Sequence, residues 1–186
     1  MMCNKYYLLI VVFFFLKSGT VMTQEVEKIL WREELKLRWD DFKGKVPNYN
    51  IGFKKAITTS EIRIKADFLD GQMPNFIVGA YFIKNQSWTI TNSDTILAHE
   101  QIHFDISELF ARKIRRTFEK LQTSKEKDYD IYIAKYYDLR KQELNLQEDY
   151  DNKVLFNKER QLEWQARISK ELQKLKDYEY NYNSEE

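Results

Sequence analysis

The hydrophobic period of this chain changes near Asn92, and the change divides the expected fold into two parts. Residues 57–68 alternate apolar and charged side chains, and residues 76–83 alternate again, which is the pattern of half-buried strands. A third short extended piece is expected at residues 87–90. From Asn92 onward, apolar residues recur at a spacing of about 3.6, which predicts helix. Strands followed by helices along a chain are typical of an α+β fold.

Three long helices are predicted in the second part. They are expected at residues 92–121, 127–150 and 158–178. Near the start, residues 25–37 hint at one helical turn, although the segment is short and ambiguous. The expected architecture is therefore a small, mostly antiparallel sheet followed by three helices.

The N-terminus has the layout of a secretory signal peptide, which we assign to residues 1–23. A lysine precedes an unbroken apolar run at residues 8–16, which is too short to cross a bilayer comfortably but suits the core of a signal peptide. An uncleaved membrane anchor is the alternative. Export predicts a periplasmic or extracellular protein without stable membrane insertion after signal cleavage.

The cysteine content and the charge of the chain limit its possible metal ligands and partners. Cys3 is the only cysteine, so the mature chain would have neither disulfides nor thiolate ligands. The 30 basic and 29 acidic residues are well mixed and give a net charge of +1, so nucleic acid is not an expected partner. Roughly 160 residues remain after the signal, enough for one domain. We assign that domain to residues 24–180 and a disordered tail to residues 181–186.

The first predicted helix carries an H-E-x-x-H motif, His99-Glu100-Gln101-Ile102-His103. Residues four apart lie on one face of a helix, so the two imidazoles can converge on a single metal ion. Glu100 can then reach a metal-bound water and act as its general base. His99 and His103 are the only histidines of the chain. The motif predicts a metal site, with two inconsequential surface histidines as the alternative.

A third metal ligand is needed, because a catalytic zinc ion usually takes three protein ligands and one water. Without further histidine or cysteine in the mature chain, a carboxylate must supply it, which suits Zn²⁺. On an unbroken helix, Asp105 and Glu108 point away from the imidazoles. We expect Asp105 to accept a hydrogen bond behind the site or at a cap, and Glu108 to pair with Arg112.

Acidic residues late in the second predicted helix can fold back toward the motif. The candidates are Glu143, Glu148, Asp149 and Asp151. We favour Asp151 as the third ligand, with Glu148 next.

Aromatic residues are expected mainly in packing roles. A stripe at near-helical spacing is predicted to be buried, with an exposed adhesive surface as the alternative; it comprises Tyr129, Tyr132, Tyr136 and Tyr137. Three tryptophans are expected in the core rather than at a substrate platform; they are Trp39, Trp88 and Trp164. Tyr150, beside Asp151, is a candidate donor to an oxyanion.

The block Leu97–Lys113 resembles the signature of the family called domain of unknown function 922. Weaker similarity extends to Trp39–Gly44, to Ser87-Trp88, to Tyr150-Asp151 and to Gln161 with Trp164. That family comprises exported bacterial proteins labelled predicted secreted zinc-dependent proteases. The resemblance implies a zincin-like frame, with His99 and His103 as zinc ligands and Glu100 as the base.

One departure from that family concerns Phe156. Similar members tend to carry a histidine shortly after the Tyr-Asp pair, where this chain reads Val154-Leu155-Phe156-Asn157. If that histidine is the usual third ligand, the site here is altered. If it stabilises the transition state instead, metal binding survives with poor turnover.

Two functions of different classes follow. The first is a secreted zinc metallopeptidase, in which a zinc-activated water deprotonated by Glu100 attacks a peptide or protein substrate. Residues 76–83 would offer a sheet edge for the extended substrate. The alternative is an exported zincin-like binding or scaffold protein that is weakly active or inactive. Hydrolysis of some other amide is neither favoured nor opposed.

Overall fold

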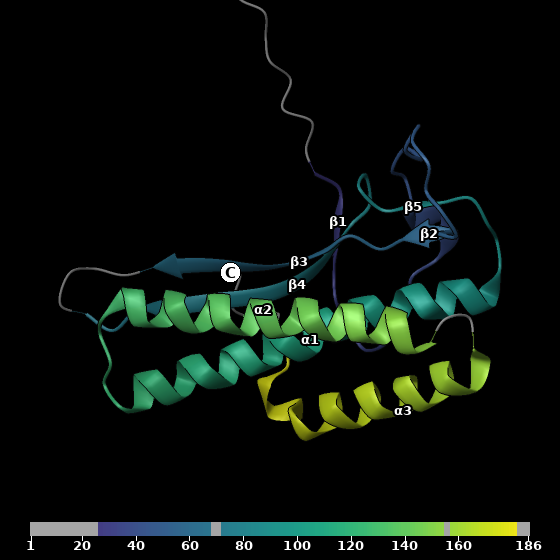
Figure 1. Ribbon diagram of the computed structural model, residues 1–186. Coiled ribbons are helices and arrows are strands. Elements are labelled where there is room, and N and C mark those ends of the chain that lie inside the picture. Colours follow the sequence, from purple (N-terminus) through teal and green to yellow (C-terminus); the bar gives the residue numbers. More distant parts are fainter. Residues whose placement is uncertain (1–25, 68–71, 155–156, 182–186) are drawn as a thin grey trace, which may run out of the picture.

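The computed structural model describes residues 26–67, 72–154 and 157–181 (Figure 1). The expected signal peptide, Phe156 and nearly all of the expected tail lie outside these described residues. Within them, no helix is long and apolar enough to cross a membrane.

Two small antiparallel sheets form the first part of the chain. In the larger sheet, β1 (Lys28–Leu30), β4 (Asn75–Ile83) and β3 (Ser60–Asp67) pair in that order. The smaller sheet joins β2 (Ala56–Ile57) to β5 (Trp88–Thr89). The strands predicted at residues 57–68, 76–83 and 87–90 are confirmed, with shifted ends.

The register of the larger sheet explains the alternation in the sequence. Ile62 lies opposite Ala80, and Ile64 opposite Val78, so apolar side chains of both strands share one face. The helical turn suggested for residues 25–37 is wrong, because residues 28–30 pair with the end of β4 as a strand. Pairing with a partner strand outweighs a short helical pattern.

The second part of the chain consists of helices, as predicted. These are α1 (Asp94–Thr123), α2 (Tyr129–Val154) and α3 (Lys158–Lys174). Single 3-10 turns, η1 (Trp39–Asp41) and η2 (Lys176–Tyr178), lie nearer the two ends. The fold class is thereby confirmed as α+β, with small antiparallel sheets followed by three helices.

The core is centred on α1, which contacts the sheet as well as α2 and α3 (Figure 1). Its buried apolar side chains recur at helical spacing; they are Ile102, Phe104, Ile106, Leu109, Phe110, Ile114 and Phe118. Trp88 and Trp164 are buried, and Trp39 is half-buried against the same core, so the expected packing role of the tryptophans is confirmed.

The tyrosine stripe of α2 is largely a packing surface. Tyr132 is fully buried, and its ring contacts Phe76 and Phe118. Tyr136 is half-buried and donates a hydrogen bond to the Ile62 carbonyl of β3 at 2.9 Å. Tyr137 is the exception, because it is 66% exposed.

A cluster of buried charged side chains lies where α1 contacts β4 and the end of α3. The Glu108–Arg112 pair predicted from the sequence is confirmed, with Nε to Oε1 at 2.9 Å. Arg115 also contacts Glu108 Oε1, at 2.6 Å, and donates to the Val78 carbonyl. All three charged side chains are buried or nearly so. The cluster ties α1 to β4 and to the end of α3, since Arg112 also donates to the Leu172 carbonyl.

Candidate metal centre

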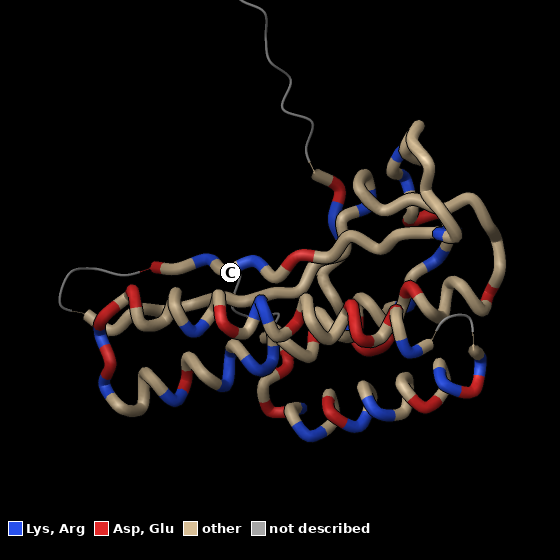
Figure 2. Tube along the Cα trace, in the orientation of Figure 1, with Lys and Arg blue, Asp and Glu red and all other residues tan. Residues whose placement is uncertain are grey.

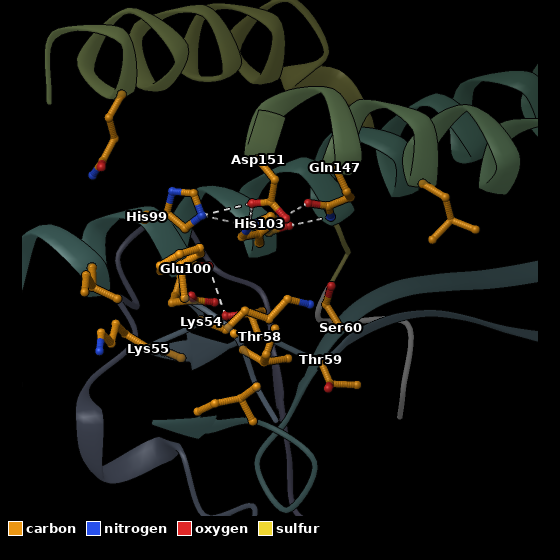
Figure 3. Close-up of a pocket in the computed structure, with 18 of the residues that line it drawn as sticks. Lys54, Lys55, Thr58, Thr59, Ser60, His99, Glu100, His103, Gln147 and Asp151 are labelled. Carbon is orange, nitrogen blue, oxygen red and sulfur yellow. Dashed lines mark hydrogen bonds and ion pairs between the residues drawn. The ribbon is translucent and has the colours of Figure 1, made fainter. Parts of the chain in front are cut away.

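Three predicted ligand residues converge at one point between α1 and α2 (Figure 3). The Oδ1 atom of Asp151 lies 3.0 Å from His99 Nε2 and 2.9 Å from His103 Nε2. The two Nε2 atoms are 3.2 Å apart. Among the described residues, this is the one group of three that could hold a metal ion.

The separations fit the donor set of a zinc site. Ligand atoms about 2.0–2.1 Å from a tetrahedral ion are separated from one another by about 3.3 Å, close to the observed spacing. The Asp151 side chain is 55% exposed, so one side of the cluster opens to solvent. An open position is the property that distinguishes catalytic zinc sites from closed structural ones.

Antiparallel packing of α1 and α2 produces the convergence (Figure 1). Three side-chain contacts cross the hairpin: His99–Asp151, His103–Gln147 and Ser107–Glu143, with sequence separations of 52, 44 and 36 residues. Each step of four residues along α1 is matched by four along α2. The register of the hairpin therefore places Asp151 level with the first histidine.

Gln147 contacts both the ring and the backbone of His103 and favours one tautomer of the neutral imidazole. The Gln147 amide nitrogen donates to the His103 carbonyl at 2.9 Å, which leaves its oxygen to accept from Nδ1–H of the same imidazole. Nε2 is then the nitrogen available to a metal ion. A partner that fixes the tautomer and orients the ring is the usual support for a metal-binding histidine.

The imidazole rings rest on Tyr150. The Tyr150 ring stacks on His99 at 4.6 Å between centroids and meets His103 edge-on at 5.0 Å. Trp164 supports the Tyr150 ring from α3, at 5.3 Å. Tyr150 is fully buried and does not line the pocket described next. Its hydroxyl has no hydrogen-bond partner among the described residues. The oxyanion role suggested for Tyr150 stays a prediction, and its position makes it a support for the histidines.

Glu100 and the three-residue cluster share one pocket of about 740 Å³. Glu100 is 4% exposed and lines this pocket beside both histidines (Figure 3). The Thr58 hydroxyl donates to the Glu100 carbonyl at 3.2 Å, which joins the helix to the opposite pocket wall. Residues 51–60 form much of that wall. Glu100 and the metal-binding cluster therefore line one pocket.

Protonation of the cluster is coupled to Asp151. Burial opposes charging of His103, but its hydrogen bond with Asp151 and the charges of Glu100 and Asp151 outweigh burial, so its pKa is raised. Burial also favours the neutral form of Asp151, but hydrogen bonds with His103 and His99 outweigh it and hold the Asp151 pKa well below its usual range. Both shifts favour a protonated His103 beside a charged Asp151, and a metal ion would take the place of that proton.

The other predicted carboxylates lie elsewhere. Glu143 is buried, accepts from Ser107 Oγ at 2.7 Å and pairs with Arg140. Glu148 and Asp149 do not belong to the cluster; Glu148 is exposed, and Asp149 pairs with Lys153. The role expected for Asp105 behind the metal ligands is wrong, because Trp31 Nε1 and Gln101 Nε2 donate to it on another face of α1.

Sequence reasoning missed Gln147 and the strand-side wall of the pocket. Gln147 lies four residues before Asp151, so helical spacing alone would have placed both on one face of α2. Residues 51–55 carry no periodic pattern, and their position beside the motif depends on tertiary packing.

Comparison with known proteins adds no relative. No family model, curated protein or solved structure matches the chain. The resemblance of Leu97–Lys113 to domain of unknown function 922 therefore stays a prediction. The proposal for this site therefore depends on its geometry.

Proposed function

We propose that this protein has a zincin-like frame and is a zinc-dependent metallopeptidase that acts outside the cytoplasm. The observation that carries the proposal is the convergence of two imidazole Nε2 atoms and the Asp151 carboxylate in a pocket that Glu100 also lines. Nitrogen and oxygen donors in this number suit zinc. Membership of the domain of unknown function 922 family is part of the same proposal.

Each residue of the site has a distinct role in the proposal. Zinc, when bound, would supply an acidified water and polarise the substrate carbonyl. His99, His103 and Asp151 hold the ion, and Gln147 accepts a hydrogen bond from Nδ1–H of His103, so that Nε2 faces the ion. Glu100 accepts a proton in the pocket and returns it to the leaving amine.

The substrate edge differs from the one predicted. The expectation that residues 76–83 offer the substrate edge is wrong, because β1 pairs with residues 81–83 of β4 and none of residues 76–83 lines the pocket. Instead, β3 is the outer strand, and residues 56–60 lead into it along the pocket wall.

Backbone groups on this wall are placed to pair with an extended peptide. Thr59 accepts from Ile83 N, and Lys55 accepts from Ile90 N. Because polar groups alternate sides along an antiparallel strand, Thr58 and Ser60 direct theirs to the opposite edge. Both residues line the pocket, so an added peptide strand would run past Glu100.

Zinc content and peptide cleavage test the proposed function together. Purified protein should hold about one zinc ion per chain and cleave members of a diverse peptide library, with cleavage lost to a chelator and restored by zinc. Zinc well below one ion per chain would contradict the site. Full zinc occupancy without any cleavage would instead favour the binding or scaffold alternative.

Removal of the Asp151 carboxylate should weaken zinc binding. Asp151→Asn is expected to lower zinc affinity by about a hundredfold. Loss of a residue that only supports a metal ligand lowers metal affinity by up to about that factor, so loss of a ligand should lower it at least as much. Competition with a chromogenic chelator measures the change. Glu148→Gln is the matched control, because Glu148 is an exposed acid on the same helix. Equal losses in both variants would show that Asp151 is not a ligand.

Zinc binding should strengthen as pH rises. Because the pKa of His103 is raised above 6.5 in the folded metal-free protein, its stabilising contribution is present below that value and is lost as pH rises through the raised pKa. Zinc must displace this proton, so affinity should rise about tenfold per pH unit below the raised pKa. Thermal unfolding with and without zinc, between about pH 6 and about pH 8, measures the effect. A zinc-induced shift in Tm that does not grow over this pH range would contradict the displacement of the His103 proton by zinc.

A further inference from the structure

One face of α2 forms a stripe that begins at the proposed metal site and leads away from it. Asp151, Gln147, Leu144 and Arg140 are spaced four, three and four residues apart, so they lie on the same side of the helix, and all line the pocket. At about 1.5 Å per residue, Leu144 lies roughly 10 Å and Arg140 roughly 16 Å from Asp151 along the axis. The stripe therefore offers contacts to several residues of a bound peptide.

Charge in the pocket is unbalanced beyond the metal site. Apart from Glu100 and Asp151, the lining carries Lys54, Lys55 and Arg140 against a single acid, Glu143. Glu143 is 2% exposed and is already held by Ser107 and Arg140. Beyond the metal site, the lining therefore carries three positive charges against one negative charge, and Lys54 and Lys55 lie on the wall opposite α2 (Figure 3).

Lys54 and Arg140 are able to contact a ligand. Lys54 is exposed and has no ion pair among the described residues, and its side chain extends into the pocket in Figure 3. The Arg140 side chain is 22% exposed. A guanidinium carries five N–H donors, and its one described side-chain bond, to Glu143, leaves donors for an incoming carboxylate.

Apolar side chains are exposed on both walls of the same pocket. Phe53 is 88% exposed on the wall formed by residues 51–60, and Leu144 is 60% exposed on α2. Large apolar residues exposed together in a concave site mark a binding surface. An apolar ligand group between these walls would cover Leu144.

We propose that the pocket selects peptides that carry an apolar side chain for Leu144 and an acidic side chain for the cations of the pocket, Arg140 and Lys54. This rests on the proposed function. An extended peptide rises about 3.3 Å per residue, so the apolar side chain lies about three residues from the cleaved bond, and an acidic side chain at Arg140 lies about five residues from it. The two contacts define the substrate class as acidic-apolar peptides.

Peptide binding tests this inference separately from catalysis. The probe is a set of fluorescent peptides with a fixed leucine and an aspartate, or asparagine in its place, moved through positions on both sides of the leucine. Binding to the zinc-loaded Glu100→Gln variant is followed by fluorescence anisotropy. We expect the best aspartate peptide to bind about tenfold more tightly than its asparagine counterpart, as one charge-assisted contact provides.

Substitutions at two positions, with a matched control, test which residues cause the preference for aspartate. Lys54→Glu and Arg140→Gln should each reduce the aspartate preference several-fold, and Arg140→Lys should restore part of it. Lys141→Glu makes the same charge change one residue along α2, on an exposed position outside the pocket, and should leave the preference unchanged. Because Arg140→Gln leaves buried Glu143 with fewer partners, Lys54→Glu is the decisive variant.

The outcomes separate the two proposals. Equal binding of aspartate and asparagine peptides, absence of binding by both, or an equal effect of Lys141→Glu and Lys54→Glu would overturn the acidic-apolar preference. Cleavage by the unsubstituted protein without that preference would leave the peptidase proposal intact. Selective binding without cleavage by the unsubstituted protein would support the substrate class and contradict the peptidase proposal.

Discussion

A Glu100→Gln variant is expected to keep its zinc and to lose peptide hydrolysis by roughly 10²–10⁴-fold, the usual contribution of a general base. Glu100 lines the pocket beside the metal-binding cluster without belonging to it. Glutamine has nearly the same shape but cannot accept the proton. Zinc content and kcat/KM on one cleaved peptide measure the two properties in the same preparation.

The control for this variant is Glu148→Gln, which removes an exposed carboxylate of α2. It should retain both zinc and activity. Loss of zinc from Glu100→Gln would mean that Glu100 holds the ion or the fold, and undiminished cleavage would place the base elsewhere.

The largest loss of stability is expected from Glu108→Ala. The substitution leaves the nearly buried Arg112 and Arg115 side chains without the carboxylate that both contact. Removing one partner from a buried ion pair typically costs about 3–5 kcal/mol. Urea unfolding of the purified variant measures the free energy of unfolding.

Glu171→Ala provides the matched comparison, because Glu171 pairs with Lys174 on the exposed surface of α3. That variant should lose less than about 1 kcal/mol, as exposed ion pairs do. Figure 2 shows charged residues of both signs along all three long helices. A loss from Glu108→Ala as small as that from Glu171→Ala would contradict the structural role of the buried cluster.

The fold was predictable where periodic patterns are long. Alternation in residues 60–67 and the helical spacing of α1 fix their elements, since burial of one face leaves little freedom. The strand β1 was missed because its three residues are held by pairing with β4 rather than by local preference. The order of the strands also depends on pairing and was not predicted. The edge proposed for the substrate is therefore on β3 rather than on β4, where the sequence had placed it.

The candidate site was predictable in its ligands but not in its surroundings. His99 and His103 follow from spacing within one helix, and the lack of other donors directs attention to a carboxylate. The choice of Asp151 over Glu148 depends on the register of two packed helices, which the sequence indicates only weakly. The support from Gln147 and the pocket wall at residues 51–60 depends on tertiary contacts between distant segments.

The most direct test of the metal site is an anomalous difference map at the zinc absorption edge, from crystals of the mature protein grown with zinc. We predict one strong peak between Nε2 of His99, Nε2 of His103 and the Asp151 carboxylate, on the side that faces the pocket. A map without a peak at this position, or with zinc bound only at other residues, would contradict the metal site and the peptidase proposal with it.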